Sequence, residues 1–386
     1  MASSNNDRST QQFDFDLHGV VGIRLLYATA KDYAIVRKQL GPIEATLARS
    51  PDVVIKFVDK LPVDSTVRLI GVDEAGFTND AFIILRGKQK SSVKVQIPLE
   101  QIGKKVEMVC ERGLQAVPLL IPIINFAALS KGVIPLHASA FTYNNVGVLV
   151  TGWAKGGKTE TLLAFTSKGA EYIGDEWVYL SEDGKHMYGI PEPIRVWNWH
   201  LRYLPEYWSL LRATDRARLR GLSLAVSSIE MLISGPVGQD SVLGGMLTRM
   251  RPLLKNQLYV HLSPQKLFGQ NGRPRMGKPE KIFFVASHES EDISVHPIDA
   301  QEVAHRMVFS LQEERIDLMS AYRKFRFAFP HLRNKLIEDT ENLQREALQR
   351  ILADKESFMV YHPYPVSIPS LFDALSPFVG LPLSAG

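Results

Sequence analysis

The eight residues 152–159 constrain this chain more than any other segment, because they read Gly-Trp-Ala-Lys-Gly-Gly-Lys-Thr and match the phosphate-binding pattern G-x-x-x-x-G-K-[ST]. An apolar run at residues 146–150 leads into them, and a helix-forming run that Gly169 can end follows. The pattern requires a loop between a strand and a helix. We therefore expect an α/β core organised around this loop, with a glycine-rich turn that exposes a lysine as the alternative.

Each residue type in the loop has a physical use in holding a phosphate chain. Glycines let backbone amides approach phosphate oxygens closely and place a helix N-terminus behind them. A lysine reaches the β and γ oxygens, and a threonine hydroxyl supplies one oxygen ligand of Mg²⁺. With ATP and Mg²⁺ as the cofactors, we expect the cofactor-binding residues to be Gly152, Lys155, Gly156, Gly157, Lys158, Thr159 and Glu160.

Two adjacent carboxylates, Asp175 and Glu176, end the next apolar run after the loop. One helix and a short return separate them from the loop, so we expect this acidic strand to lie beside the strand that leads into the loop. Next to a magnesium phosphate, one carboxylate can hold the metal while the other accepts the proton of an attacking hydroxyl. We expect Asp175 to be the base and Glu176 to be linked to the metal; the alternative is a solvated strand end.

The loop and its surroundings also carry a longer pattern. It consists of Leu-His-Ala-Ser at residues 136–139, Gly-Val-Leu-Val-Thr-Gly at 147–152, Gly-Lys-Thr-Glu-Thr at 157–161 and the run 169–176. Together these resemble the core of HPr kinase/phosphorylase and its relatives, in the phosphoenolpyruvate carboxykinase-like class of P-loop proteins. The resemblance is specific over residues 132–180 and general to about residue 315. It implies that Asp175, Lys158 and His137 are catalytic and that Thr159 binds the metal; for His137 the alternative is a histidine satisfied inside a sheet.

The chain departs from HPr kinases in three places. Their paired acids are Asp-Asp, where this chain has Asp-Glu, and their later glycine-rich signature is not intact here. The nearest counterpart is residues 191–195, where Glu192 would be a second metal ligand. Their substrate-gripping loop has only residues 249–252 or 272–275 as loose counterparts. The resemblance therefore implies a kinase of this fold that acts on a hydroxyl other than that of HPr, in a small molecule or in a protein serine.

Composition limits the partners and the compartment. The chain has 386 residues, 45% of them hydrophobic and 22% charged, which fits a packed globule of two or three domains. A net charge of +4 suits an anionic ligand such as a nucleotide and falls short of a nucleic-acid binder. One cysteine, Cys110, favours a reducing compartment, so we expect a cytoplasmic protein with no membrane partner. The oligomeric state stays open, and a homo-oligomer is one option.

The predicted fold class is α/β, or α+β over the whole chain, in four regions. Residues 1–15 are expected to be disordered and residues 16–128 to form an α+β accessory domain. Residues 129–315 are expected to form the HPr kinase-like P-loop core, and residues 316–386 a C-terminal helical extension. The last region rests on an amphipathic pattern at residues 343–358, which predicts a helix.

Two other functions remain open on the same residues. A nucleotide-binding sensor of this fold, which transfers nothing, fits the missing late signatures. An NTPase that drives a conformational change also fits the loop, although the short spacing to Asp175 counts against it. The ten histidines show no close metal-ligand spacing, so a zinc site is not expected.

Overall fold

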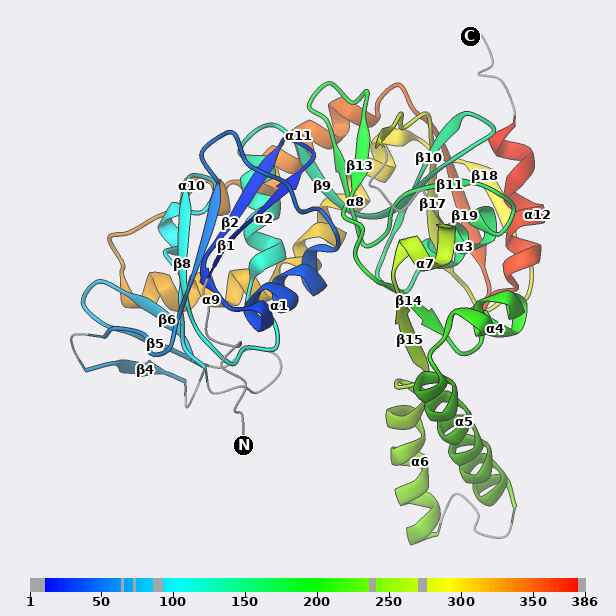
Figure 1. Cartoon of the computed structure of the whole chain (residues 1–386). Helices are drawn as coiled ribbons and strands as arrows, with labels where there is room; N and C mark the ends of the chain where they lie inside the picture. Colours follow the sequence, from blue (N-terminus) through cyan, green and yellow to red (C-terminus); the bar gives the residue numbers. More distant parts are fainter. Residues whose placement is uncertain are drawn as a thin grey trace.

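Figure 1 shows the computed structural model of the chain, which describes residues 11–63, 66–71, 74–85, 93–235, 241–269 and 276–380. Two lobes lie side by side, and a helical hairpin projects from the second lobe (Figure 1). Helices and mixed sheets together confirm the predicted α/β class. Among the described residues, every helix is too short or too polar to cross a lipid bilayer.

The first lobe contains one mixed sheet. Its elements are β1 (Gln11–Leu17), β2 (Val21–Ala28), α1 (Ala30–Leu40), β3 (Val53–Val58), β4 (Arg68–Ile70), β5 (Ala75–Phe77), β6 (Phe82–Ile84), β7 (Val95–Gln96), η2 (Leu99–Gln101), β8 (Val106–Glu111) and α2 (Leu120–Leu129). Within the described residues the strand order is β1-β2-β3-β8-β7-β6-β5-β4. The central strands β2, β3 and β8 run parallel, and α1 is the crossover between the first two.

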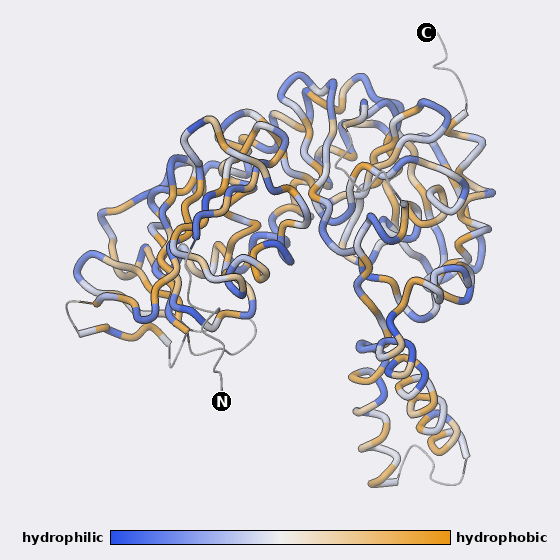
Figure 2. Tube along the Cα trace, in the orientation of Figure 1, coloured by the Kyte–Doolittle hydropathy of each residue, from blue (hydrophilic) through white to orange (hydrophobic). Residues whose placement is uncertain are grey.

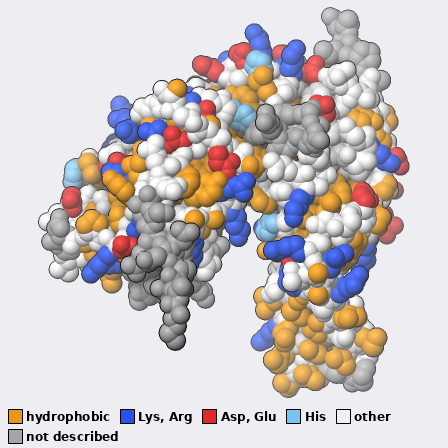
Figure 3. All heavy atoms as spheres, viewed as in Figure 1, with side chains coloured by type: hydrophobic (Ala, Val, Ile, Leu, Met, Phe, Trp, Pro, Cys, Tyr) orange, Lys and Arg blue, Asp and Glu red, His pale blue; other side chains and the backbone are white. Residues whose placement is uncertain are grey.

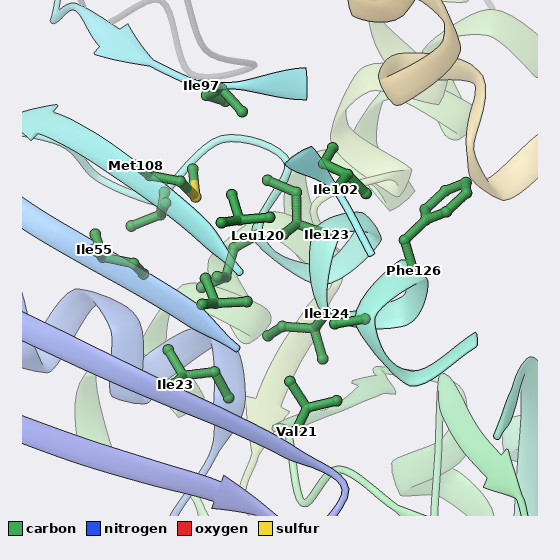
Figure 4. Packing of buried hydrophobic residues seen from close by; sticks show 14 of the residues in the cluster. Val21, Ile23, Ile55, Ile97, Ile102, Met108, Leu120, Ile123, Ile124 and Phe126 are labelled. Carbon is green, nitrogen blue, oxygen red and sulfur yellow. The ribbon is translucent and has the colours of Figure 1, made fainter. Parts of the chain in front are cut away.

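Helix α2 packs on this sheet and closes the core of the first lobe. Figure 4 shows strand residues such as Ile23 and Ile55 facing helix residues such as Ile124, and all three are fully buried. The C-terminal part of the chain contributes α9 (Ile316–Ala328), which buries Phe325 in the same core. Residues beyond 316 therefore belong partly to the first lobe.

The N-terminal strand corrects the prediction of disorder over residues 1–15. Strand β1 begins at Gln11 and pairs antiparallel with β2. It alternates aromatic and acidic side chains, so that Phe15 is buried while Asp14 forms an ion pair with Arg24. The polar composition of the N-terminal segment suggested disorder, although aromatic and acidic residues alternate along it with the two-residue period of a strand. Residues 1–10 lie outside the described part of the chain.

The second lobe is built on a larger mixed sheet. Its strands are β9 (Ile134–Tyr143), β10 (Val146–Gly152), β11 (Glu171–Gly174), β12 (Trp177–Leu180), β13 (Met187–Gly189), β16 (Met276–Gly277), β17 (Lys281–Ser287), β18 (Ser294–Pro297) and β19 (Glu356–His362). Within the described residues the order is β16-β13-β12-β9-β10-β17-β19-β18, and β11 also pairs with β9. Figure 2 shows apolar stretches along the inner strands of both lobes.

Helices cover both faces of the second sheet. One face carries α3 (Lys158–Thr166) and α12 (Ile368–Val379), and the other carries α8 (Ala300–Glu314) and α11 (Thr340–Leu352). The remaining elements are β14 (Ile194–Trp197), α4 (His200–Tyr203), η3 (Pro205–Leu210), α5 (Ala213–Ser234), α6 (Val242–Lys255), β15 (Tyr259–Leu262), α7 (Pro264–Phe268) and α10 (Lys335–Glu338). Strands β14 and β15 pair at the base of the α5–α6 hairpin.

The acidic strand β11 does not lie beside β10, which corrects the sequence prediction. Strand β9 lies between them and pairs antiparallel with both. Asn144 and Asn145 join β9 to β10 with φ values of 50° and 65°, the backbone of a tight hairpin turn. Because that turn fixes β9 against β10, β11 takes the other edge of β9.

The predicted C-terminal helical extension is also wrong. The helix expected over residues 343–358 ends at Leu352, and β19 follows it. Strand β19 pairs parallel with β17 inside the second sheet, so its apolar run is buried among neighbouring strands. The second lobe therefore extends well beyond residue 315.

Candidate functional site

The loop 152–159 lies between the end of β10 and the start of α3. Gly157 is the N-cap of α3, and within the described chain no side chain caps this helix. The first backbone N–H groups of a helix have no acceptor inside the helix. An open helix N-terminus of this kind attracts an anion through those N–H groups and through the helix dipole.

Two loop glycines are required by their surroundings. Gly157 has a φ of 105°, and a Cβ there would lie 2.1 Å from Nε2 of His362. Gly152 has a φ of 151°, and its Cβ would lie 2.3 Å from the carbonyl oxygen of Val285. The backbone therefore approaches its neighbours more closely than any side chain would allow.

His362, at the end of β19, holds the loop in this conformation. Its Nε2 lies 2.8 Å from the carbonyl oxygen of Gly156, so this nitrogen donates a hydrogen bond to the loop. The imidazole is fully buried. His362 was not predicted from the sequence, because it comes from a strand that was expected to be part of a helical extension.

Lys158, in the first turn of α3, is folded back onto the loop. Its Nζ donates to the carbonyl oxygen of Trp153 at 2.9 Å, and the side chain is almost fully buried. Burial lowers the pKa of Lys158, while the nearby carboxylates of Glu176 and Asp175 offset part of that shift. The ammonium group is therefore positioned at the loop, on backbone acceptors that it can exchange for stronger ones.

The side chain of Asp175 contacts the loop directly. Thr159 Oγ1 donates to Asp175 Oδ2 at 3.1 Å, and Ser139 Oγ on β9 donates to Oδ1. The carboxyl group is buried, and burial together with the charge of Glu176 raises its pKa to about 6. A carboxylate with such a pKa is ionised at neutral pH and is a stronger base than an exposed one.

Glu176 and His137 form the next layer of the site. The backbone of Glu176 has a φ of 64°, which is uncommon for a residue other than glycine and marks the sharp turn between β11 and β12. His137 Nε2 lies 3.1 Å from Glu176 Oε2, and its Nδ1 lies 2.6 Å from Glu314 Oε1. Burial lowers the pKa of His137, but the hydrogen bonds to the two carboxylates outweigh burial and raise it overall.

Glu314 is a site residue that the sequence analysis missed. It stands at the C-terminal end of α8, far along the chain from the loop. Its neighbourhood, Gln-Glu-Glu-Arg, looks like an ordinary solvated helix end. Only the packing of α8 on the sheet brings it to His137.

The residues predicted to bind metal are not assembled into a ligand cluster. Thr159 contacts Asp175 rather than Glu176 or Glu192. Glu192 Oε1 is buried without a hydrogen-bond partner among the described residues, and burial raises the pKa of this carboxyl well above its usual value. Within that same part of the chain, no group of three or more His, Cys, Asp or Glu side chains could hold a metal ion by itself.

Two predicted cofactor-binding residues have other surroundings. Glu160 is buried, and its Oε1 lies 3.1 Å from Nε2 of the fully buried His200. Burial raises the pKa of Glu160, but the hydrogen bond and charge of His200 lower it overall. This pairing turns the side chain into the interior. Lys155 is exposed, in the left-handed backbone region at a φ of 63°.

A cavity of about 540 Å³ opens beyond Glu314, between the two lobes. Trp177 and Glu314 line it on the side of the site, and Phe82, Val117 and Lys324 line it on the side of the first lobe. Leu119, in the loop before α2, also lines the cavity and has a φ of 57°. Backbone strain of this kind concentrates at functional sites.

The two segments considered as counterparts of a substrate-gripping loop do not assemble at this site. Residues 249–252 are part of α6 on the projecting hairpin, so they form a helix rather than a loop. Residues 272–275 lie outside the described residues.

No protein-family model matches this chain, and no curated protein sequence matches it either. The resemblance to HPr kinases therefore stays a prediction from the motifs.

Proposed function

We propose that this protein is an ATP- and Mg²⁺-dependent kinase with a P-loop core of the HPr kinase type, which transfers the γ-phosphoryl group to a hydroxyl. The observation that carries the proposal is the contact between Thr159 Oγ1 and the buried Asp175 carboxylate, beside Lys158 at the open end of α3. A loop with the phosphate pattern and the acidic end of the next strand come together there, one helix apart in the chain.

The residues present fit both cofactors. The open N-terminus of α3 and the Lys158 ammonium group match the negative charge of a phosphate chain. The Thr159 hydroxyl and the Glu176 carboxylate are oxygen ligands of the kind Mg²⁺ prefers, and Mg²⁺ keeps several waters, so it needs no larger protein cluster. When bound, magnesium ATP would supply the transferable phosphoryl group and a metal charge that neutralises its oxygens.

The side chains then have separate tasks. Lys158 exchanges the carbonyl of Trp153 for phosphate oxygens, which are charged and therefore stronger acceptors. Asp175 accepts the proton of the attacking hydroxyl, for which its raised pKa of about 6 is suited. His137 bridges the carboxylates of Glu176 and Glu314 and so fixes their positions at the edge of the site. Catalysis in this class of reaction is mainly positioning and electrostatic stabilisation.

The cavity beyond Glu314 favours a small molecule over a protein serine as the acceptor. Its volume of about 540 Å³ is in the ordinary range for small-ligand sites. Three acids and one lysine line it, namely Glu74, Glu314, Asp317 and Lys324. This charge balance supports a neutral or cationic alcohol with an apolar portion that packs on Phe82 and Val117.

Transfer from γ-labelled ATP to the small-molecule fraction of a cell extract tests the proposal. Wild type should label at least one compound, Lys158→Ala should label none, and Lys168→Ala should behave as wild type, because Lys168 is exposed at the other end of α3. Labelling that persists in Lys158→Ala would remove the loop from the mechanism. Tight ATP binding with no labelling by wild type would identify a nucleotide sensor, and phosphate release with no labelled product would identify an NTPase.

A further inference from the structure

A cavity of about 680 Å³ lies between the first lobe and the base of the α5–α6 hairpin, and we call it the basic cavity. Figure 3 shows Lys and Arg side chains gathered where the base of the hairpin faces the first lobe. Among the described residues, it shares no lining residue with the cavity beyond Glu314. The Lys, Arg and acidic side chains that line it are Lys38, Arg212, Asp215, Arg218 and Lys266.

The positive charges of the basic cavity exceed its negative charge. Asp215 is the one acid in its lining among the described residues, and Arg212 Nε already lies 2.8 Å from its carboxylate. Lys38, Arg218 and Lys266 therefore have no carboxylate of their own in this lining. Cations that gather without counter-charges repel one another, so an arrangement of this kind favours an anionic ligand.

Arg218 is fixed in place without being neutralised. Its guanidinium group donates to the backbone carbonyl oxygens of Gln257 at 3.0 Å and Tyr259 at 2.5 Å. Carbonyl oxygens carry no full charge and a guanidinium group has further N–H donors, so its charge stays available to a ligand. Helix α5 begins beside it at the N-cap Arg212, where no described side chain caps the helix, and adds the positive end of its dipole.

The paired strands β14 and β15 add positive charge beside the basic cavity. Arg195 on β14 and His261 on β15 are directly opposite in the antiparallel pair, so their side chains share one face. His261 lines the cavity. Burial lowers the pKa of His261 most, and the positive charges of Arg195 and Lys38 lower it further. A cation of the second lobe and a cation of the first lobe therefore act on the same imidazole.

The first lobe reaches this cavity through a close backbone contact. Gly41, the C-cap of α1, has a φ of 71°, and a Cβ there would lie 2.2 Å from the carbonyl oxygen of Pro191. Lys38 is in the last turn of α1, so this contact brings its side chain to a lining formed mainly by the second lobe. A ligand in the basic cavity would therefore contact both lobes.

The size and charge of the basic cavity favour a phosphorylated small molecule. Its volume is in the ordinary range for small-ligand sites. A phosphoryl group on an ester carries about two negative charges at neutral pH and several strong acceptor oxygens, whereas a carboxylate carries a single charge. Phosphoryl groups therefore match the unpaired cations Lys38, Arg218 and Lys266 better than a carboxylate does.

We propose that the basic cavity binds a phosphorylated small molecule, whose phosphoryl groups contact Lys38 of the first lobe together with Arg218 and Lys266 of the second. This site goes beyond the proposed kinase reaction and does not depend on it. A ligand held in this way links the two lobes next to the segment that carries Glu192.

Calorimetric titration with pyrophosphate, without ATP or magnesium, tests the proposal. The background is Lys158→Ala, so that the loop 152–159 contributes little to binding. This background should bind pyrophosphate with a dissociation constant below about 1 mM at low salt. Adding Lys38→Ala and Lys266→Ala should weaken binding by about tenfold or more, because two cationic partners are lost. The matched control adds Lys31→Ala and Lys168→Ala, which remove the same charge from exposed positions outside the cavity, and it should bind as tightly as the background.

The imidazole of His261 reports binding in the cavity itself. NMR titration should give a higher pKa for His261 with pyrophosphate than without it, because nearby negative charge stabilises the imidazolium. His261→Gln identifies the signal by removing it.

Three results would overturn the proposal. The Lys158→Ala background could fail to bind pyrophosphate, the variant lacking Lys38 and Lys266 could bind as tightly as its matched control, or the pKa of His261 could stay unchanged. Citrate that binds as tightly as pyrophosphate would contradict the assignment to a phosphorylated ligand, since its charge is carried by carboxylates alone.

Discussion

Replacing Gly157 with alanine tests how the loop is held. The alanine would have to adopt a φ of 105°, and its Cβ would lie 2.1 Å from His362 Nε2. The left-handed backbone costs a residue with a side chain about 1–2 kcal/mol. Relieving the overlap displaces the buried His362 and breaks its hydrogen bond to Gly156, which costs about 1 kcal/mol more. We expect a total destabilisation of about 2–3 kcal/mol.

Gly169→Ala is the matched control for this change. Gly169 ends the same helix with a φ of 92°, and a Cβ there would meet no described atom within 4 Å. Gly169→Ala should therefore destabilise the protein only through its left-handed backbone, by about 1–2 kcal/mol. Urea unfolding followed by circular dichroism measures both variants. If Gly157→Ala destabilises the protein no more than Gly169→Ala, the account of His362 as the support of the loop is wrong.

Three further predictions concern acidic side chains in the site and beside it. Asp175→Asn should reduce transfer by about 10²–10⁴-fold, and wild-type activity should fall as the pH drops below about 6, where the base is protonated. Because the pKa of Asp175 in the folded protein lies above the ordinary value of 3.8, ionisation of this carboxyl destabilises the fold. The melting temperature of Asp175→Asn should therefore rise relative to that of wild type between pH 4 and pH 8. Glu160→Ala leaves His200 buried without its partner and should cost about 3 kcal/mol, measured by chemical unfolding. Glu314→Gln removes one of two carboxylates beside His137, so NMR titration should give a lower pKa for His137 than in wild type; an unchanged pKa would place Glu314 outside the site.

The sequence predicts the loop and its acidic partner because both are local patterns. The glycines and Lys158 follow from what a phosphate chain needs within eight residues, and Asp175 follows one helix later. Their contact through Thr159 agrees with that prediction. The position of β11 could also have been predicted, because two asparagines between apolar runs are a hairpin signal that fixes β9 beside β10.

The rest of the site depends on tertiary packing that no local pattern contains. Glu314 and His362 come from a helix end and a late strand, and each reaches the loop only because the sheet brings distant segments together. Strand β19 was mistaken for the end of a helix, since four consecutive apolar or aromatic residues fit either structure until neighbouring strands are known. Glu160 was assigned to the cofactor from its place beside Thr159, whereas His200 explains it as an interior pair.

Titration calorimetry of magnesium ATP into the protein tests the central claim most directly. The account predicts binding with a dissociation constant between about 1 μM and 1 mM, dependent on Mg²⁺ and lost in Lys158→Ala. Binding that Lys158→Ala retains in full, or no heat of binding to wild type at any concentration, would contradict it.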